Sequence, residues 1–416
     1  MRKNKSESEG EAFMSKKEIG RRAFMKSSLA GVGSFFFLPP NGGELGLRAQ
    51  TEKPDGKKIV RRVLGKTGIK LPPINMGVMN SDNPNLVRAA LSGGMVMLDT
   101  AQTYQRGTNE AMIGEVLKGR PRDSFVLATK SRLPHDQKTG IYLSEATEEA
   151  YAKKIDTSLK NLGLDYVDIY YHHNVWAKES ALYEPILNAL MKAKKAGKTR
   201  FIGITTHRNE PEIIHAAAES KVYDVVLTTY NFKQKHYPEV RSAMTKAADA
   251  GLGIVVMKAL GGRQLQEGSR EPIDPKAALK WALQDPNTHT IIAGFTTFDQ
   301  MNLDLSVMED PVLTKPEKAH LQRGALMAGL YCQGCGQCLS QCSQALPIPD
   351  LMRAYMYVYG YRNIVAAQDL VTSLELPLKV CEGCDSCPVS CAIGFRVRDR
   401  IRKVVRLREV PLEFIA

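Results

Sequence analysis

The sequence predicts an α/β fold, a (β/α)8 barrel, followed by a smaller cysteine-rich domain. Three observations support this prediction. Short β-branched runs alternate with longer helical patterns between residues 58 and 310. These runs number eight, and a (β/α)8 barrel typically occupies about 250 residues. All eight cysteines of the 416-residue chain come after residue 331, which sets the C-terminal part apart from the barrel.

The eight runs have the composition and length of β-strands. They are residues 74–78, 96–98, 125–129, 167–171, 201–204, 225–229, 254–257 and 290–293. Helical patterns lie between them, for example at 148–162, 185–196, 212–219, 239–250 and 275–284. Gly163 and Gly197 are typical helix stops, and Asn209 with Glu212 predicts an N-cap followed by a glutamate at N3. An open, doubly wound sheet is the alternative, but no G-x-G-x-x-G motif follows an early strand.

The first fifty residues are not expected to belong to the barrel. Arg21, Arg22 and Lys26 precede an apolar stretch at 27–38 and then a proline- and glycine-containing segment. This order is typical of a secretory signal, and the twin arginine resembles a Tat signal, which exports folded proteins. We therefore expect a periplasmic or otherwise exported protein, with cleavage after Ala49 as one guess. The alternatives are an uncleaved anchor or a chance basic N-terminus, but the apolar stretch is too short to span a bilayer as a helix.

The formal net charge of +13 could suggest an anionic partner. The excess is spread along the chain, however, and no run of five or more like charges occurs. No nucleic-acid partner and no stable membrane span are therefore expected.

The cysteines form two blocks with one spacing, C-x2-C-x2-C-x3-C. The first block is Cys332, Cys335, Cys338 and Cys342, and the second is Cys381, Cys384, Cys387 and Cys391. This spacing matches the bacterial ferredoxin run, in which the fourth cysteine ligates the other cluster. It predicts two [4Fe–4S] clusters in a ferredoxin-like domain. One cluster would take Cys332, Cys335, Cys338 and Cys391, and the other Cys381, Cys384, Cys387 and Cys342.

Disulfides and zinc are the alternatives for these cysteines. Eight cysteines allow 105 disulfide pairings, but two copies of one spacing do not resemble a disulfide framework. Zinc sites use pairs of cysteine pairs, and a third cysteine two residues on does not suit them. One departure concerns the crossed assignment, because Pro388 follows the third cysteine of its block rather than the fourth. The expected organisation is a signal and linker at 1–50, the barrel at 58–315 and the cluster domain at 325–416.

Polar residues follow the second, third and fourth predicted strands, where a barrel places its active site. They are Asp99, Tyr104, Lys130 and the pair His172 and His173. Each alone has a structural explanation, as a helix cap, a loop aromatic, a solvated strand end or a core histidine. Together at one end of a barrel they indicate proton donation to a developing alkoxide. A tyrosine has a reference pKa of about 10, and a nearby lysine cation would lower it, which predicts a general acid tuned toward the working pH.

Residues 60–310 resemble the aldo-keto reductase family. The segments that carry the resemblance are 63–68 (VLGKTG), 97–104 (MLDTAQTY), 127–130 (LATK) and 162–173 (LGLDYVDIYYHH). The resemblance implies a catalytic tetrad of Asp99, Tyr104, Lys130 and His173, with His173 preferred to His172 by its spacing from Asp168. It also implies carbonyl–alcohol interconversion of a small molecule. The further signal and two-cluster tail are similar to a subgroup of exported or iron–sulfur members.

The resemblance also implies a nicotinamide cofactor, NADP or NAD, bound without a Rossmann fold. Thr205 and Thr206 would contact the carboxamide, and Tyr230 would stack on the nicotinamide ring. The pyrophosphate loop and the adenosine-phosphate segment would use Lys258, Leu260, Gly261, Gly262, Gly294, Thr296, Thr297 and Gln300. Leu227 departs from the family where many members carry glutamine. No Lys or Arg adjoins Thr296 and Thr297, which leaves the choice between NAD and NADP open.

The role of the clusters stays open at this point. They could be structural, they could exchange electrons with a redox partner protein, or the barrel could host redox chemistry without nicotinamide. An electron-transfer protein whose barrel is a docking scaffold is the competing function. The segment between the cysteine blocks, 350–374, is rich in Tyr and Met. It is interpreted as a packing helix in preference to an aromatic shield near the clusters.

Overall fold

The computed structural model describes residues 59–262, 273–325, 329–374, 376–384 and 386–415. The predicted signal at 1–50 lies outside these residues. Within them, no helix is long and apolar enough to cross a membrane. Residues 57–416 form one compact unit, although two domains are expected from the sequence. The chain from 329 on thus packs on the barrel.

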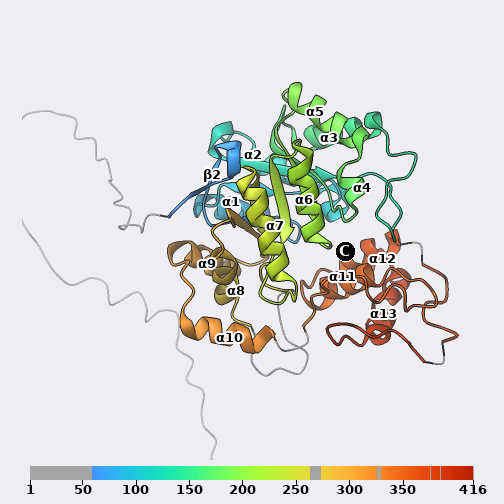
Figure 1. The fold of residues 1–416 in the computed structure, drawn as a ribbon. Coiled ribbons are helices and arrows are strands. Elements are labelled where there is room, and N and C mark those ends of the chain that lie inside the picture. The colour runs from blue at the N-terminus through green and yellow to red at the C-terminus, as the bar shows by residue number, and fades with distance from the viewer. Residues whose placement is uncertain (1–58, 263–272, 326–328, 375, 385, 416) are drawn as a thin grey trace, which may run out of the picture. The chain divides into compact units, whose positions relative to one another are not determined.

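Eight parallel strands close into a barrel in the order β10-β3-β4-β5-β6-β7-β8-β9, which confirms the predicted fold class (Figure 1). The strands are β3 (Ile74–Gly77), β4 (Met97–Asp99), β5 (Val126–Ser131), β6 (Val167–His172), β7 (Thr199–Thr206), β8 (Val225–Thr229), β9 (Gly253–Met257) and β10 (Thr290–Ala293). All eight overlap the predicted runs, because consecutive β-branched residues suit strands that are covered on both faces.

The barrel helices follow the strands in sequence. They are α1 (Pro84–Ser92), α2 (Asn109–Leu117), α3 (Glu148–Leu162), α4 (Lys178–Ala181), α5 (Glu184–Lys195), α6 (Glu210–Ser220), α7 (Tyr237–Asp249), α8 (Pro275–Leu283) and α9 (Phe298–Glu309), with α10 (Lys315–Ala325) after them. The predicted N-cap is right in position but lacks its hydrogen bond. Asn209 is the N-cap residue of α6, with φ of 56°, but its side chain does not accept from the helix backbone. Its amide instead donates to the Glu212 carboxylate.

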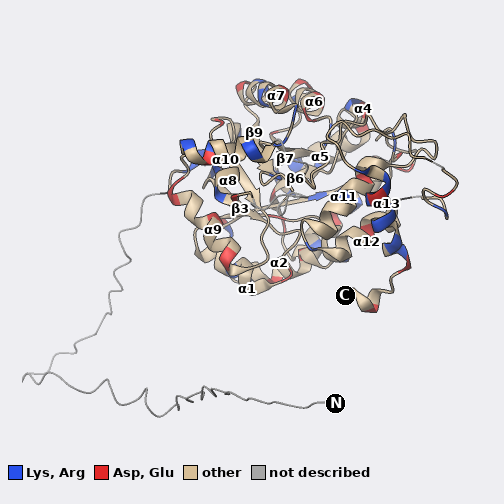
Figure 2. Ribbon diagram, turned by 90° about the horizontal axis from the view of Figure 1, so that it is seen from below, with Lys and Arg blue, Asp and Glu red and all other residues tan. Residues whose placement is uncertain are grey.

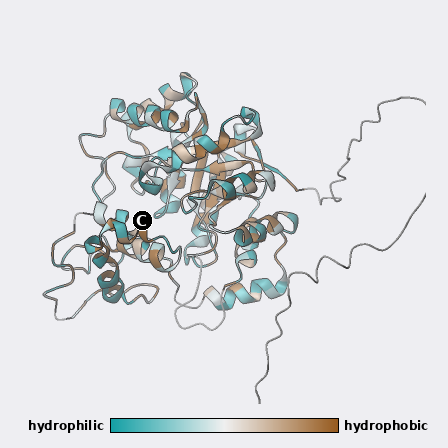
Figure 3. Ribbon diagram, turned by 180° about the vertical axis from the view of Figure 1, so that it is seen from behind, coloured by the Kyte–Doolittle hydropathy of each residue, from teal (hydrophilic) through white to brown (hydrophobic). Residues whose placement is uncertain are grey.

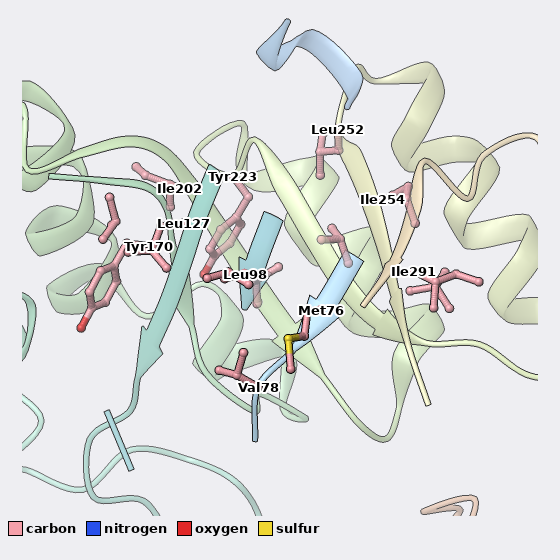
Figure 4. Packing of buried hydrophobic residues seen from close by; sticks show 14 of the residues in the cluster. Met76, Val78, Leu98, Leu127, Tyr170, Ile202, Tyr223, Leu252, Ile254 and Ile291 are labelled. Atoms are coloured by element: carbon pink, nitrogen blue, oxygen red, sulfur yellow. The ribbon is translucent and has the colours of Figure 1, made fainter. Parts of the chain in front are cut away.

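Two apolar layers stabilise the barrel. Met76, Leu98 and Leu127 belong to the outer layer between strands and helices, seen from close by in Figure 4. Side chains such as Met97 and Leu227 form the inner layer. The strands are correspondingly among the most hydrophobic parts of the ribbon in Figure 3.

A short hairpin closes the N-terminal end of the barrel. Strands β1 (Arg62–Val63) and β2 (Lys70–Leu71) pair in antiparallel fashion, and Leu64 and Leu71 belong to the inner layer. A Cβ on Gly65 would lie 2.4 Å from the backbone nitrogen of Gly253, where β9 begins. Because this end is sealed, ligands are expected at the opposite end, where the strands finish.

Gly203 leaves room inside the barrel for the Tyr171 ring on the neighbouring strand. A Cβ on Gly203 would lie 2.2 Å from Cδ1 of Tyr171, and Tyr171 is fully buried. We expect Gly203→Ala to lower the free energy of unfolding by about 1–3 kcal/mol through overpacking. Gly77→Ala is the matched control, since its Cβ would meet only ordinary contacts, at 3.6 Å or more. Urea unfolding of both variants checks this, and equal stability would contradict it.

The C-terminal chain forms three helices, α11 (Ile348–Tyr359), α12 (Ile364–Ser373) and α13 (Val397–Val405). They share a separate apolar core that includes Leu351, Val371 and Ile401, and α13 carries a row of basic residues (Figure 2). No strand occurs among the described residues from 329 on. The likeness to ferredoxins therefore rests on cysteine spacing.

Polar contacts join this segment to the barrel. Arg208 pairs with Asp350 at 3.2 Å, and both side chains are buried. Arg106 pairs with Asp369 at 3.0 Å, and the Lys235 ammonium donates to the carbonyl of Ala392. These contacts involve loops at the C-terminal ends of the strands, so the tail covers the end of the barrel that is predicted to hold the site.

Candidate active site

The four predicted catalytic residues lie near the carboxyl ends of neighbouring strands, and Asp99, Lys130 and His173 are buried while Tyr104 is half-buried. Asp99 ends β4, Lys130 is in β5, and His173 follows β6. Tyr104 begins the short helix η2 (Tyr104–Gly107) in the loop after β4. The turns that follow parallel strands thus bring together residues that are far apart in the sequence.

Asp99 and Lys130 form a buried ion pair. The Lys130 ammonium donates to the Asp99 carboxylate and, at 2.7 Å, to the carbonyl of Thr100. Only 2% of either side chain is exposed. Burial lowers the pKa of Lys130 and raises that of Asp99, and the attraction between the two charges opposes both shifts. The carboxylate therefore holds the ammonium in one position.

Tyr104 lies between Lys130 and His173. The Lys130 ammonium is 4.8 Å from the centroid of the tyrosine ring, and the His173 ring meets it edge-on with centroids 6.4 Å apart. Burial raises the pKa of Tyr104 well above its usual value, and the charge of Asp99 raises it further. The expected lowering by Lys130 is therefore wrong for this structure, in which the lysine donates to Asp99 and Thr100.

The two adjacent histidines have different surroundings. His172 hydrogen-bonds to the hydroxyls of Tyr142 and Tyr223, so its ring is held in the packing of the barrel. His173 faces Tyr104, and its Nδ1 has no hydrogen-bond partner among the described residues. Burial lowers the pKa of His173 well below its usual value, so its ring is neutral. This geometry favours His173 as the substrate-orienting residue.

The predicted carboxamide contacts are engaged elsewhere in this structure. The Thr205 hydroxyl accepts from the backbone nitrogen of Asn174 at 2.7 Å. The Thr206 hydroxyl donates to the carbonyl of Arg208, also at 2.7 Å. Leu227 points into the inner apolar layer of the barrel. Thr205 and Thr206 therefore lie at the expected strand end, but their hydroxyls bind the backbone of neighbouring loops.

Tyr230 does not occupy the position predicted for it. Its ring packs against Trp281 of α8 with centroids 4.9 Å apart, and it belongs to the outer core layer. The physical reason is the alternation of side chains along a strand. Leu227 faces the barrel interior, so Tyr230, an odd number of positions later, faces outward. Stacking on a nicotinamide ring inside the barrel is thus excluded, and this parity was readable in the sequence.

The two remaining predicted cofactor segments differ in their surroundings. The loop after β9 holds Lys258, Leu260, Gly261 and Gly262. Gly262 packs against the tail, because a Cβ added to it would lie 3.2 Å from the Cβ of Tyr331. The adenosine segment is open. At the exposed start of α9, the Gln300 side chain accepts from the backbone nitrogen of Thr296, and the Thr297 hydroxyl accepts from that of Gln300. Gly294 precedes this segment.

Helix α11 and the residues just after it supply groups that sequence reasoning missed. Tyr357 and Tyr361 both act electrostatically on Tyr104, and their rings stack with centroids 5.7 Å apart. Arg353, one turn before Tyr357, acts on His173 and His207. The Tyr-rich pattern of this segment was the only available signal. It indicated packing but not that the helix lies beside the tetrad.

A small, partly open cavity lies where the tail meets the barrel. The barrel contributes His207, Arg208 and Lys258, and the tail contributes Cys332 and Arg353, among other residues. Burial lowers the pKa of His207, and the nearby His173 and Lys130 lower it further, so the cavity lies next to the tetrad. One of the predicted cluster ligands therefore lines the wall of the candidate active site.

All eight cysteines are free thiols in this structure. Their mutual charge interactions separate them into two groups. Cys338 interacts with Cys332, Cys335 and Cys391, whereas Cys381 interacts with Cys342, Cys384 and Cys387. Burial raises the pKa of Cys332 to about 11 and that of Cys338 to about 12. The grouping matches the crossed assignment predicted from the spacing.

No group of three or more His, Cys, Asp or Glu side chains in the described parts of the chain is arranged around a single metal ion. This does not count against the clusters. A cubane cluster is larger than one ion and is held by four separate thiolates. Its ligands need not converge on one point.

Comparison with known proteins connects this geometry to a family. Residues 75–278 match the model of the aldo/keto reductase family. An aldo-keto reductase of Mycobacterium sp. (strain MCS) is 30% identical over 272 residues, which cover 61% of this chain and 87% of the relative. The chain belongs to the aldo/keto reductase family. The family consists of NAD(P)-dependent oxidoreductases, and its fold accounts for the barrel.

Two other relatives of this chain carry more specific names. L-galactose dehydrogenase of Arabidopsis thaliana is 36% identical over 161 residues, 36% of this chain and 49% of the relative. L-glyceraldehyde 3-phosphate reductase of Escherichia coli (strain K12) is 30% identical over 162 residues, 36% of this chain and 46% of the relative. The chain thus spans about half the length of these curated relatives.

Solved structures of reductases share the barrel. The holo form of an aldo-keto reductase from Bacillus halodurans has a TM-score of 0.53 at 23% identity, and the match covers 64% of this chain and 96% of that one. An aldo-keto reductase from Klebsiella pneumoniae in complex with NADPH has a TM-score of 0.50 at 20% identity, with the same coverage. At these identities the likeness shows the fold alone.

Proposed function

We propose that this protein is an exported iron–sulfur oxidoreductase of aldo-keto reductase type that interconverts a small carbonyl compound and its alcohol. The observation that carries the proposal is the convergence of Asp99, Tyr104, Lys130 and His173 at the carboxyl ends of the strands. General acid catalysis needs a proton donor, an orienting group and a fixed charge within one water-poor site. The tetrad supplies all three.

Tyr104 is the proton donor in this proposal. Its raised pKa keeps the hydroxyl protonated at neutral pH, which suits donation to a developing alkoxide. The Lys130 ammonium, 4.8 Å from the ring centroid, favours the negative charge that forms nearby. Neutral His173 orients the carbonyl oxygen. The site is therefore better suited to carbonyl reduction than to alcohol oxidation.

A bound nicotinamide would supply the hydride. The open start of α9 offers Gly294, Thr296, Thr297 and Gln300 for the adenosine end, and Leu260, Gly261 and Gly262 offer loop backbone after β9 for the pyrophosphate. Tyr230 is not part of this site, because it packs on Trp281. The segment at 296–300 carries no cation, so both NADP and NAD remain in the proposal.

The tail is proposed to hold two [4Fe–4S] clusters. The separation of the cysteines into two groups of four supports this assignment. Twin arginines at 21 and 22 support export by a Tat route to the periplasm, since that route carries proteins that already contain their cofactors.

A second candidate function is electron transfer to or from a redox partner protein. Cys332 lines the cavity beside the tetrad, and Tyr357 of helix α11 is close enough to Tyr104 to raise its pKa further. A cluster at Cys332 would be close to whatever the cavity binds. In this alternative the barrel hosts redox chemistry that does not depend on nicotinamide.

Turnover by anaerobic holoprotein tests the proposal. NADH or NADPH is mixed with aldehydes, ketones and sugars, and nicotinamide absorbance and the cluster spectrum are followed together. We expect Tyr104→Phe to reduce turnover by about 10²–10⁴-fold, because the general acid is lost. Tyr359→Phe, a change on the exposed side of α11, is the control. Equal turnover in both variants, or no nicotinamide binding at all, would contradict the reductase assignment and favour electron transfer.

A further inference from the structure

The cavity between barrel and tail is strongly cationic. Arg208 and Lys258 follow strands β7 and β9, and Arg353 comes from α11. Arg132, after β5, adds a fourth cation that acts on Arg353. Asp350 is the one carboxylate among the described lining residues, and the carboxylate of Glu210 acts on Lys258 from the border. The cavity and its border therefore carry more positive than negative charge.

Asp350 is already engaged by two of these cations. It pairs with Arg208 at 3.2 Å and also with Arg353. One carboxylate between two guanidinium groups leaves a net positive charge. Asp350 therefore does not balance the remaining cations of the site.

Lys258 makes no hydrogen bond or ion pair with any described residue. Two further polar atoms beside it have no hydrogen-bond partner among the described residues, His207 Nδ1 and the Arg208 Nε donor. Buried polar atoms without partners are costly to a fold, so their presence around one cavity indicates a polar ligand that binds there.

Helix α11 relates this cavity to the catalytic tyrosine. Arg353 lines the cavity, and Tyr357, four positions later, acts on Tyr104. Residues four apart lie on one face of a helix, separated by about one turn of 5.4 Å. A ligand held at Arg353 would thus need only a short chain to reach Tyr104.

We propose that this cavity binds the anionic end, a carboxylate or a phosphate, of a short substrate whose carbonyl or hydroxyl carbon lies at Tyr104. Lys258 and Arg353 are its recognition residues. The inference rests on the proposed function for the reacting end only. The anion site itself stands on the cavity, its charges and its unsatisfied polar atoms.

Calorimetry on anaerobic, cluster-loaded full-length protein tests the site with matched pairs of probes. Lactate is compared with lactamide, and glycerol 3-phosphate with glycerol, so the two arms distinguish a carboxylate from a phosphate. We expect the charged member of at least one pair to bind at least about tenfold more tightly than its neutral partner. Lys258→Met should weaken the charged probe by about tenfold or more and leave the neutral one unchanged.

Further variants separate the possible explanations. Lys138→Met, on an exposed turn, is the control for a lost surface charge. Arg353→Met is a second test of the same site. Tyr104→Phe should keep anion binding while losing turnover. If the wild-type protein bound the anion but showed no turnover, only the reductase function would be refuted, and the anion site would stand. Equal binding of charged and neutral probes would overturn the anion site, and so would unchanged binding in Lys258→Met. If Lys258→Met lost its cluster absorbance together with anion binding, the anion site would also be overturned.

Discussion

Replacing Lys130 by methionine is expected to lower the free energy of unfolding by about 3–5 kcal/mol. The ammonium pairs with Asp99 where only 2% of either side chain is exposed. Removing it leaves a buried carboxylate without its counter-charge and the carbonyl of Thr100 without a donor. The measurement is chemical unfolding of the holoprotein under anaerobic conditions. Activity should fall as well, because the charge beside Tyr104 is lost.

Two controls show whether burial is the cause of this effect. Lys192→Met removes one partner of an ion pair with Glu148 whose lysine is 72% exposed, and should cost about 0–1 kcal/mol. The double variant Lys130→Met with Asp99→Leu should recover much of the lost stability, because replacing both partners removes the unpaired charge. If Lys130→Met were no more destabilising than Lys192→Met, the ion pair would not be held in a dry site.

Replacing Cys391 by serine is expected to remove the same cluster that Cys332→Ser removes, although the two residues belong to different blocks. Cys391 is grouped with Cys332 and Cys338 in the structure. A cubane that loses one of its four thiolates is poorly held. Each variant should therefore lose about half of the protein's iron and sulfide. The double variant Cys332→Ser with Cys391→Ser should lose no more than either single one.

Iron and sulfide analysis with electron paramagnetic resonance spectra checks this pairing. Cys342→Ser and Cys381→Ser are the matched pair for the second cluster, because Cys381 interacts with Cys342. They should remove a different signal from the one lost in Cys332→Ser. If Cys391→Ser instead matched Cys381→Ser, each block would hold its own cluster and the crossed assignment would be wrong.

The sequence by itself determined the barrel and the composition of the tetrad. The strands are local runs of β-branched residues between helical patterns, and short-range pattern is enough to place them. Helix α3, Glu148–Leu162, matches its predicted range because Thr147 caps one end and Gly163 ends the other. The grouping of cysteines was also readable, since it follows from spacing along the chain.

Only the tertiary structure decided how the site is tuned and what covers it. The direction of the Tyr104 pKa depends on burial and on Asp99, Tyr357 and Tyr361, whose distances no local pattern gives. The Arg208–Asp350 pair joins residues 142 positions apart, and the cationic cavity exists because the tail packs over the strand ends. A sequence shows which charges a chain carries. Which of them meet in a buried site, and which are left without a partner, is fixed by packing between distant segments.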